Sequence, residues 1–375
     1  MPNYFATCAR GLEPLLAEEV RALGAIDIEA GRGGVSFAGD HALLYKANLW
    51  LRTAVRVLRP VLTAPVQTPD DLYDAVRTVD WSAIMTPDHT LAVDCNVRDS
   101  GITHSQYAAR RVKDAICDQF VDRCGRRPSV DTERPTVGLN LHVYRDVAIL
   151  SLDSSWDSLH KRGYRPALTR APLNEALAAG LLMRTGWKGD TPLIDPMCGS
   201  GVFPIEAAWL ALGRPPGLTR KHFGFMGWLD FDIGLWARLR DDARVGMKKA
   251  LPAFIGGSDV RTDAVDFARA NAKAAGIGHL LNFERKDLKE FRPPEGPPGV
   301  LICNPPYGER IGSEEELRPL YRLIGATIGQ RCRDWACFVF TSQDAPWREM
   351  GMKAAETIPF WNGKIECRLM RFAPR

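Results

Sequence analysis

Hydrophobic and polar positions follow two different rhythms along the chain. In the first 160 residues, short apolar runs of strand character alternate with amphipathic segments of helical period. The expected elements are strands at 4–7, 33–37 and 91–97, helices at 12–20, 40–48 and 105–120, and a hairpin of 136–144 with 147–152. This mixed order predicts an α+β region.

From Arg170 onward the pattern changes to a regular alternation of strands and helices. The expected strands are 192–195, 254–259, 300–303 and 336–341, and the expected helices are 202–212, 261–275 and 314–330. Such alternation predicts a parallel α/β sheet. Residues 213–253 interrupt the rhythm and are rich in Trp, Phe and Arg. Because long insertions in regular domains are usually functional, we expect this one to have a function.

Composition and charge narrow the class of protein. With 45% hydrophobic and 25% charged residues, no secretory signal and no apolar run of membrane-spanning length, we expect a globular cytoplasmic protein. The nine cysteines include no Cys-x-x-Cys pair, which predicts reduced thiols and no metal site. Residues 1–160 carry 17 Lys and Arg against 21 Asp and Glu, whereas 161–375 carry 32 against 24. A polyanion would therefore be drawn mainly to the second part of the chain.

The most specific motif is Asn304-Pro305-Pro306-Tyr307, directly after the apolar run 299–303. The amide oxygen of Asn304 and the backbone carbonyl of Pro305 can each accept one N–H, and Tyr307 can cover the face of a planar ring. The two prolines fix φ and remove two donors, so the turn is stiff and presents acceptors only. This combination suits a planar ring with an exocyclic NH₂ group. The alternative is an ordinary proline turn at the end of a strand.

A second motif follows the strand 192–195 and opens a helix. Its residues are Asp195, Pro196, Met197, Cys198, Gly199, Ser200 and Gly201. The two glycines let the backbone approach a ligand, and the N–H groups at the start of the helix favour an anion such as a carboxylate. Pro204 stands where the dinucleotide fingerprint needs a third glycine, and no Gly-Lys-Ser/Thr follows. Both NAD and a P-loop nucleotide are therefore disfavoured.

Two acidic residues follow the next expected strands. Asp259 ends the strand 254–259, and Asp287, before Leu288, lies at the end of the strand expected after it. Open α/β sheets bind ligands at the carboxyl ends of their strands. There Asp259 could accept both ribose hydroxyls of an adenosine ligand, and Asp287 could accept an adenine amine. The alternative for a single Asp is a cap or turn residue.

Together, the motifs at 195–201 and 304–307 resemble motifs I and IV of the class I S-adenosylmethionine-dependent amino-methyltransferases. The segment 159–165, with 171–173, resembles the lead into that domain in the THUMP-containing RNA methyltransferases. Segments that are similar to a THUMP domain lie at 108–116, 127–131 and 150–153. The insertion, with Phe223-Gly224-Phe225 and Trp228, resembles that of the bacterial guanine-N2 methyltransferases of large-subunit ribosomal RNA.

The resemblance implies three regions and one cofactor. It implies a ferredoxin-like α+β region at 1–60, a THUMP domain at 61–158 and a Rossmann-like class I methyltransferase domain at 159–375 with the insertion at about 213–253. S-adenosylmethionine is the implied cofactor, and the implied cofactor residues are Pro172, the motif 195–201, Asp259, Asp287, Leu288 and Asn304. The implied catalytic residues are Asn304, Pro305, Pro306 and Tyr307.

Two features depart from the family pattern. Trp156 stands where a small residue is expected, which predicts a stiffer hinge into the catalytic domain. The sequence ends at Arg375, so we expect a single methyltransferase domain where longer members carry a second one.

Basic clusters are the candidate phosphate contacts. They comprise Arg110, Arg111 and Lys113, then Arg126 and Arg127, and finally Lys161, Arg162 and Arg165. Any one cluster could instead be a solvated surface. The first hypothesis is an RNA guanine-N2 methyltransferase acting on large-subunit (23S) rRNA. The alternatives are a tRNA guanine-N2 methyltransferase of the same architecture and a non-catalytic RNA-binding assembly factor, and the motif alone does not separate guanine N2 from adenine N6.

Overall fold

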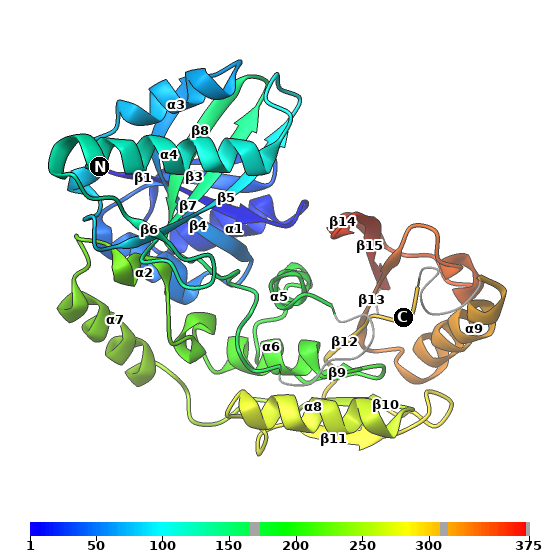
Figure 1. Ribbon diagram of the computed structural model, residues 1–375. Helices are drawn as coiled ribbons and strands as arrows, with labels where there is room; N and C mark the ends of the chain where they lie inside the picture. The colour runs from blue at the N-terminus through cyan, green and yellow to red at the C-terminus, as the bar shows by residue number, and fades with distance from the viewer. Residues whose placement is uncertain (166–172, 308–313, 373–375) are drawn as a thin grey trace.

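The computed structural model describes residues 1–165, 173–307 and 314–372. These residues form two mixed α/β halves, each built on its own sheet (Figure 1). The N-terminal sheet has the strand order β2-β3-β1-β4-β8-β7-β5-β6, and the C-terminal sheet has the order β11-β10-β9-β12-β13-β15-β14. In the described ranges, no helix is both long and apolar enough to cross a membrane.

The N-terminal half joins the first two expected regions in one sheet. Its elements are β1 (Asn3–Cys8), α1 (Glu13–Ala22), β2 (Ile26–Gly31), β3 (Gly34–Ala38), α2 (His41–Trp50), β4 (Ala54–Pro65), α3 (Pro69–Arg77), β5 (Thr90–Arg98), α4 (Ser105–Cys124), β6 (Ser129–Val130), β7 (Val137–Tyr144) and β8 (Val147–Asp153). The long strand β4 pairs with β1 on one side and β8 on the other. The expected division at residue 60 therefore falls inside a strand that both regions share.

The alternation of β7 shows how this sheet is built. Leu139, Leu141 and Val143 have no exposed surface, whereas His142 between them is exposed. One face of the strand is therefore apolar and the other polar, as expected for a sheet with one buried face. The paired helices α3 and α4 lie on this part of the half (Figure 1).

The C-terminal half is a Rossmann-like sheet, as the alternating pattern predicted. Its strands are β9 (Leu193–Asp195), β10 (Ile255–Asp259), β11 (Asn282–Arg285), β12 (Val300–Cys303), β13 (Ala336–Ser342), β14 (Glu356–Asn362) and β15 (Ile365–Phe372), and its helices are α5 (Glu175–Arg184), α6 (Val202–Ala211), α7 (Ile233–Val245), α8 (Thr262–Ala274) and α9 (Glu314–Arg331). Strands β9 to β13 pair in parallel, so their carboxyl ends meet at one edge. The antiparallel hairpin of β14 and β15 completes the sheet.

The insertion packs on the N-terminal half. Phe225 lies 4.5 Å from Tyr45 between ring centroids, and the Tyr45 hydroxyl accepts a hydrogen bond from the Asp232 backbone N–H at 2.9 Å. Trp236 lies edge-on to Phe225 with 5.1 Å between centroids. A Cβ at Gly224 would lie 2.1 Å from the Asp153 carbonyl oxygen, so only glycine allows this approach. These contacts give the insertion a structural role: it fastens the catalytic half to the N-terminal core.

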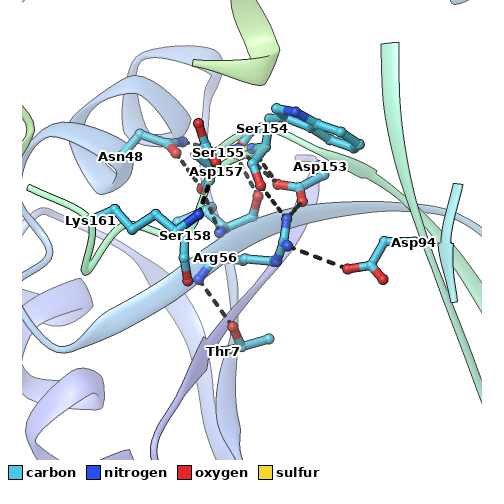
Figure 2. A network of polar contacts seen from close by, with 12 residues as sticks. Thr7, Asn48, Arg56, Asp94, Asp153, Ser154, Ser155, Asp157, Ser158 and Lys161 are labelled. Atoms are coloured by element: carbon cyan, nitrogen blue, oxygen red, sulfur yellow. Dashed lines mark hydrogen bonds and ion pairs between the residues drawn. The ribbon is translucent and has the colours of Figure 1, made fainter. Parts of the chain in front are cut away.

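A buried polar network holds the segment that leads from β8 into the catalytic half (Figure 2). Arg56 contacts the carboxylate of Asp153 and the carbonyl oxygen of Trp156, and its other Nη lies 3.3 Å from Asp94. Asp153 has no exposed surface; burial raises the pKa of its carboxyl, and the Arg56 charge opposes that rise. Trp156 has a left-handed backbone with φ of 56° and donates from Nε1 to the Glu133 carbonyl at 3.0 Å. These contacts restrain the hinge at which Trp156 stands.

Phe225→Ala should lower the free energy of unfolding by about 3–5 kcal/mol, because it empties a fully buried ring position between the two halves. Ile233→Ala is the matched control, since that side chain lies in the same insertion but is 72% exposed. Chemical denaturation followed by circular dichroism measures both. Equal, small losses for the two variants would contradict the structural role of the insertion.

Candidate active site

The site lies where β9, β10 and β12 end at the carboxyl edge of the C-terminal sheet. Asp195 ends β9 and is only 2% exposed. Its Oδ1 accepts the backbone N–H of Met197 at 3.0 Å, which folds the following turn. Burial raises the pKa of Asp195 well above its usual range, and the nearby Asp259 charge adds to the rise. Asp195 therefore holds the conformation of the loop that follows β9 through a hydrogen bond from a buried side chain.

The glycine loop after Asp195 starts helix α6. Gly199 and Gly201 have φ of 52° and 83°, a conformation that glycine adopts without strain. A Cβ at Gly201 would lie 3.0 Å from the Cβ of Ala268 and 3.1 Å from the Phe283 ring, so the loop packs closely against α8 and β11. No described side chain caps α6, so N–H groups in its first turn are available to an anionic ligand.

Asp259 connects this loop to the end of β10. Its Oδ2 accepts the Gly199 N–H at 2.9 Å, and its Oδ1 accepts the Arg261 N–H at 3.0 Å. The carboxylate is partly exposed, and each oxygen keeps a second lone pair for a ligand hydroxyl. Asp259 thus stands beside the glycine loop and presents acceptor oxygens there.

Asp287 and Leu288 lie just beyond β11. Asp287 is partly exposed and accepts the Lys289 N–H at 2.8 Å, so it forms a turn and still presents a carboxylate. Leu288 is 7% exposed and belongs to the apolar core on α9. Pro172, the remaining expected cofactor residue, lies outside the described residues.

Asn304 carries the clearest sign of an incomplete site. It follows β12, and its buried Oδ1 has no hydrogen-bond partner among the described residues. Leaving such an acceptor unpaired costs about 1–3 kcal/mol, which a ligand N–H would recover. The adjacent Pro305 is buried, and it places its backbone carbonyl in the same turn.

The rest of the turn is held from two sides. The Tyr321 hydroxyl donates to the Pro306 carbonyl at 3.3 Å and lies 2.5 Å from the Thr341 hydroxyl. The Tyr307 ring lies edge-on to Phe340, with 6.3 Å between centroids, and its hydroxyl accepts from Asn362 Nδ2 at 3.1 Å. Burial raises the pKa of Tyr307, so its hydroxyl stays protonated. Sequence reasoning missed Tyr321 and Asn362, because neither lies in a recognisable motif.

The prediction that Arg162 and Arg165 contact RNA is wrong. Arg162 has no exposed surface; its Nε lies 3.4 Å from Glu206 Oε1, and its Nη2 donates to the Arg52 carbonyl at 2.6 Å. The Arg165 side chain is 6% exposed and donates to Ser200 Oγ at 3.0 Å. Both guanidinium groups are therefore internal, and Arg165 contacts the glycine loop at Ser200.

The other basic candidates remain on the surface. Arg110, Arg126, Arg127 and Lys161 are exposed, whereas Arg111 and Lys113 are partly buried. Several have acidic neighbours: Arg111 lies 2.6 Å from Asp70, Lys113 2.5 Å from Asp114 and Lys161 3.5 Å from Asp157, and Arg126 pairs with Asp88. These pairs reduce the positive potential of α4, so its basic residues form a weaker anion surface than the sequence suggested.

Three family models match the chain in succession. The RlmL ferredoxin-like domain matches residues 3–58, the THUMP domain matches 66–153 and the RMKL-like methyltransferase domain matches 162–371. Among solved structures, a putative methyltransferase complexed with SAH is 30% identical with a TM-score of 0.91, covering 100% of this chain and 98% of its own. A predicted N6-adenine-specific DNA methylase from Listeria monocytogenes is 32% identical with a TM-score of 0.88, covering 100% and 96%.

Curated relatives match over nearly the whole chain. A putative RNA methyltransferase of Synechocystis is 42% identical over 369 residues, which cover 98% of this chain and 96% of the relative. The ribosomal RNA large subunit methyltransferase K/L of Syntrophotalea carbinolica is 45% identical over 382 residues, 99% of this chain and 53% of the relative. The chain thus spans about half the length of the K/L relatives.

Fold and site together define a Rossmann-like, S-adenosylmethionine-dependent methyltransferase behind a ferredoxin-like and a THUMP domain. The chain belongs to the RMKL-like methyltransferase family. The glycine loop, the uncapped start of α6 and the carboxylate of Asp259 fit this cofactor, because they offer N–H groups to its carboxylate and acceptors to its ribose. Within the described residues, no group of three or more His, Cys, Asp or Glu side chains could hold a metal ion.

Asp259→Ala should weaken S-adenosylmethionine binding about 10- to 100-fold, because both the ribose acceptor and the Gly199 contact are lost. Asp263→Ala, in the first turn of α8 and exposed, should bind like the unaltered protein. Isothermal titration calorimetry measures both affinities. Unchanged binding by Asp259→Ala would remove it from the cofactor site.

Proposed function

We propose that the protein transfers the methyl group of S-adenosylmethionine to the N2 amine of a guanine in large-subunit ribosomal RNA. The observation that carries the transfer to an amine is the buried Oδ1 of Asn304, for which the described part of the chain supplies no hydrogen-bond partner. The RNA class is supported by the THUMP match and by the names of the curated relatives. Guanine N2 as the acceptor rests on the family resemblance of the insertion and the turn.

The chemistry explains why an amide and a carbonyl suffice at the acceptor. The N2 lone pair of guanine is delocalised into the ring, which makes it a weak nucleophile. If Asn304 Oδ1 and the Pro305 carbonyl each accept one of its hydrogens, they favour a pyramidal nitrogen and stabilise the positive charge that grows during attack. Bound S-adenosylmethionine supplies an electrophilic methyl group. After attack, the nitrogen loses its proton readily, so the site needs no strong base.

Tyr307 supplies the flat surface for the base. A guanine inside a helix or stack cannot reach a turn at the edge of the sheet, so it must leave its stack at a cost of a few kcal/mol. Stacking on an aromatic side chain recovers about 1–3 kcal/mol of that cost. The ring of Tyr307 is anchored and partly buried beside Asn304, which suits it to this task.

Asn304→Ala should reduce methyl transfer about 10²- to 10³-fold while leaving S-adenosylmethionine affinity within about twofold, because the side chain acts on the acceptor amine. Asn304→Asp, which keeps an acceptor oxygen, should retain more activity than the alanine variant. The measurement is transfer of a labelled methyl group to rRNA from a strain that lacks the gene. Transfer by Asn304→Ala at the original rate would overturn the amine clamp.

The same strain identifies the acceptor. Nucleoside mass spectrometry of its rRNA and tRNA should show loss of N2-methylguanosine from the large-subunit rRNA alone. Loss from tRNA would favour the tRNA enzyme, and loss of N6-methyladenosine would favour an adenine acceptor, as the name of the Listeria relative suggests for that protein. Unchanged nucleosides in both pools would favour a non-catalytic assembly factor.

Arg110→Glu should weaken RNA binding and lower the slope of log affinity against log salt by about 1 or more, because Arg110 is exposed on α4. Arg21→Glu makes the same charge change on α1 and should leave the slope unaltered. Fluorescence anisotropy at several salt concentrations measures both slopes. Identical slopes for the two variants would remove α4 from the RNA interface.

A further inference from the structure

The β14–β15 hairpin holds the hydroxyl of Tyr307. Asn362, the last residue of β14, donates from Nδ2 to that hydroxyl at 3.1 Å. Cys367 of β15 lies near the same hydroxyl. With its hydroxyl fixed by the hairpin and one edge against Phe340, the ring has a set orientation. The hairpin therefore determines the ring plane together with the proline turn.

The same hairpin contacts the N-terminal half. The Arg10 guanidinium lies over the Trp361 ring, 3.8 Å from its centroid, directly before Asn362. The next residue, Gly11, has φ of 95°, and a Cβ there would lie 3.0 Å from the Pro359 carbonyl oxygen. The turn between β1 and α1 therefore packs against β14. The β14–β15 hairpin lies beside the N-terminal sheet (Figure 1).

Leu12, the next residue of this turn, continues the contact with the catalytic half. It has no exposed surface and packs with the core of the catalytic half, although it belongs to the N-terminal half. A Cβ at Gly180 of α5 would lie 2.4 Å from its Cδ2. The turn at 10–12 is thus fixed to the catalytic half by a cation–π contact, a backbone approach and a buried leucine.

We propose that Asn362 is a positioning residue for methyl transfer and that it acts through Tyr307. Arg10 in turn holds Asn362 in place through its contact with the neighbouring Trp361. This inference rests on the proposed role of Tyr307 as the platform for the base. Orientation of the ring sets where the amine lies relative to Asn304, and small displacements of a reacting group lower turnover steeply. The N-terminal half thereby contributes to active-site geometry in addition to binding RNA.

A double-mutant cycle tests the route through Tyr307. Asn362→Leu, which keeps the side-chain volume and removes the donor, should lower kcat about three- to tenfold with little change in KM for RNA or in S-adenosylmethionine affinity. In a Tyr307→Phe background, which lacks the hydroxyl, the same substitution should add less than about a twofold loss. Asn362→Asp can accept the hydroxyl proton and should restore part of the turnover. Equal losses in both backgrounds would overturn the proposal.

Glu366→Gln is the matched control for the hairpin. Glu366 is exposed and lies opposite Trp361 in the β14–β15 register, so its amide variant should leave kcat unchanged. A loss as large as that of Asn362→Leu would mean that any change in the hairpin lowers turnover, which would also overturn the proposal.

A second readout does not depend on activity. With 3-fluorotyrosine incorporated throughout, the ¹⁹F resonance of Tyr307 is identified by its loss in Tyr307→Phe. It should shift in Asn362→Leu and in Arg10→Ala, with a smaller shift in Arg10→Lys, which keeps the charge but loses the planar stack. An unshifted resonance in Asn362→Leu would overturn the positioning role, and an unshifted resonance in Arg10→Ala would overturn the role of Arg10 in holding Asn362. Shifted resonances with no methylation of any RNA would overturn only the proposed function.

Discussion

The buried guanidinium of Arg162, paired with Glu206 inside the catalytic half, joins that half to the N-terminal half. Neither side chain is more than 1% exposed, and burying two charges costs several kcal/mol each unless their hydrogen bonds are satisfied. Here Arg162 also donates to the carbonyls of Leu159 and Arg52, and the Tyr164 hydroxyl donates to Glu206 Oε1 at 2.9 Å, whereas Glu206 Oε2 has no hydrogen-bond partner among the described residues. Arg52 belongs to the N-terminal half and Glu206 to the helix that starts at the cofactor loop. An arrangement of the halves that moved Arg52 away would leave a donor of the buried Arg162 guanidinium without its acceptor.

Apolar side chains also hold the two halves together, because each half contributes side chains to the hydrophobic core of the other. Leu12 leaves the N-terminal half to complete the catalytic core, and the insertion sends Phe223 and Phe225 into the N-terminal core. Each half therefore lacks part of its own hydrophobic core. Removal of either contribution would leave an apolar cavity in the other half, so the two halves share part of their hydrophobic packing.

The parts of the site that follow from local sequence were predictable, and the parts that depend on distant contacts were not. The glycine loop and the proline turn lie where the motifs predicted, because strand ends and special backbone conformations are properties of short segments. The prediction that Arg162 contacts RNA was wrong because a basic cluster normally indicates exposed side chains. The burial of Arg162 depends on Glu206, which lies 44 residues away in the sequence. Asn362 was missed because strands β14 and β15 were not predicted.

The insertion shows a different limit of sequence reasoning. Its Trp, Phe and Arg content led us to expect a function without indicating which one, and in the structure Phe225 and Trp236 are buried against Tyr45. Aromatic residues serve a core and a nucleic-acid surface equally well, because both uses bury the same flat apolar area. Packing in a core and binding to a nucleic acid are distinguished only by where the surface that covers the aromatic residues lies. The periodicity of the sequence carries no information about that position.

If the proline turn holds an amine as proposed, its geometry selects the amine more than a particular base. Two acceptors and a ring face would fit the N2 group of guanine and the N6 group of adenine alike, since both amines are exocyclic and coplanar with their ring. The bases differ at the ring nitrogen beside the amine, which carries a hydrogen in guanine and a lone pair in adenine. Discrimination must therefore come from a group that faces that ring edge or from the RNA segment delivered to the turn. Because Arg162 and Leu12 hold the two halves together, an RNA bound by the N-terminal half as proposed would reach Asn304 in one fixed geometry, and that geometry would select the nucleotide that the turn itself cannot distinguish.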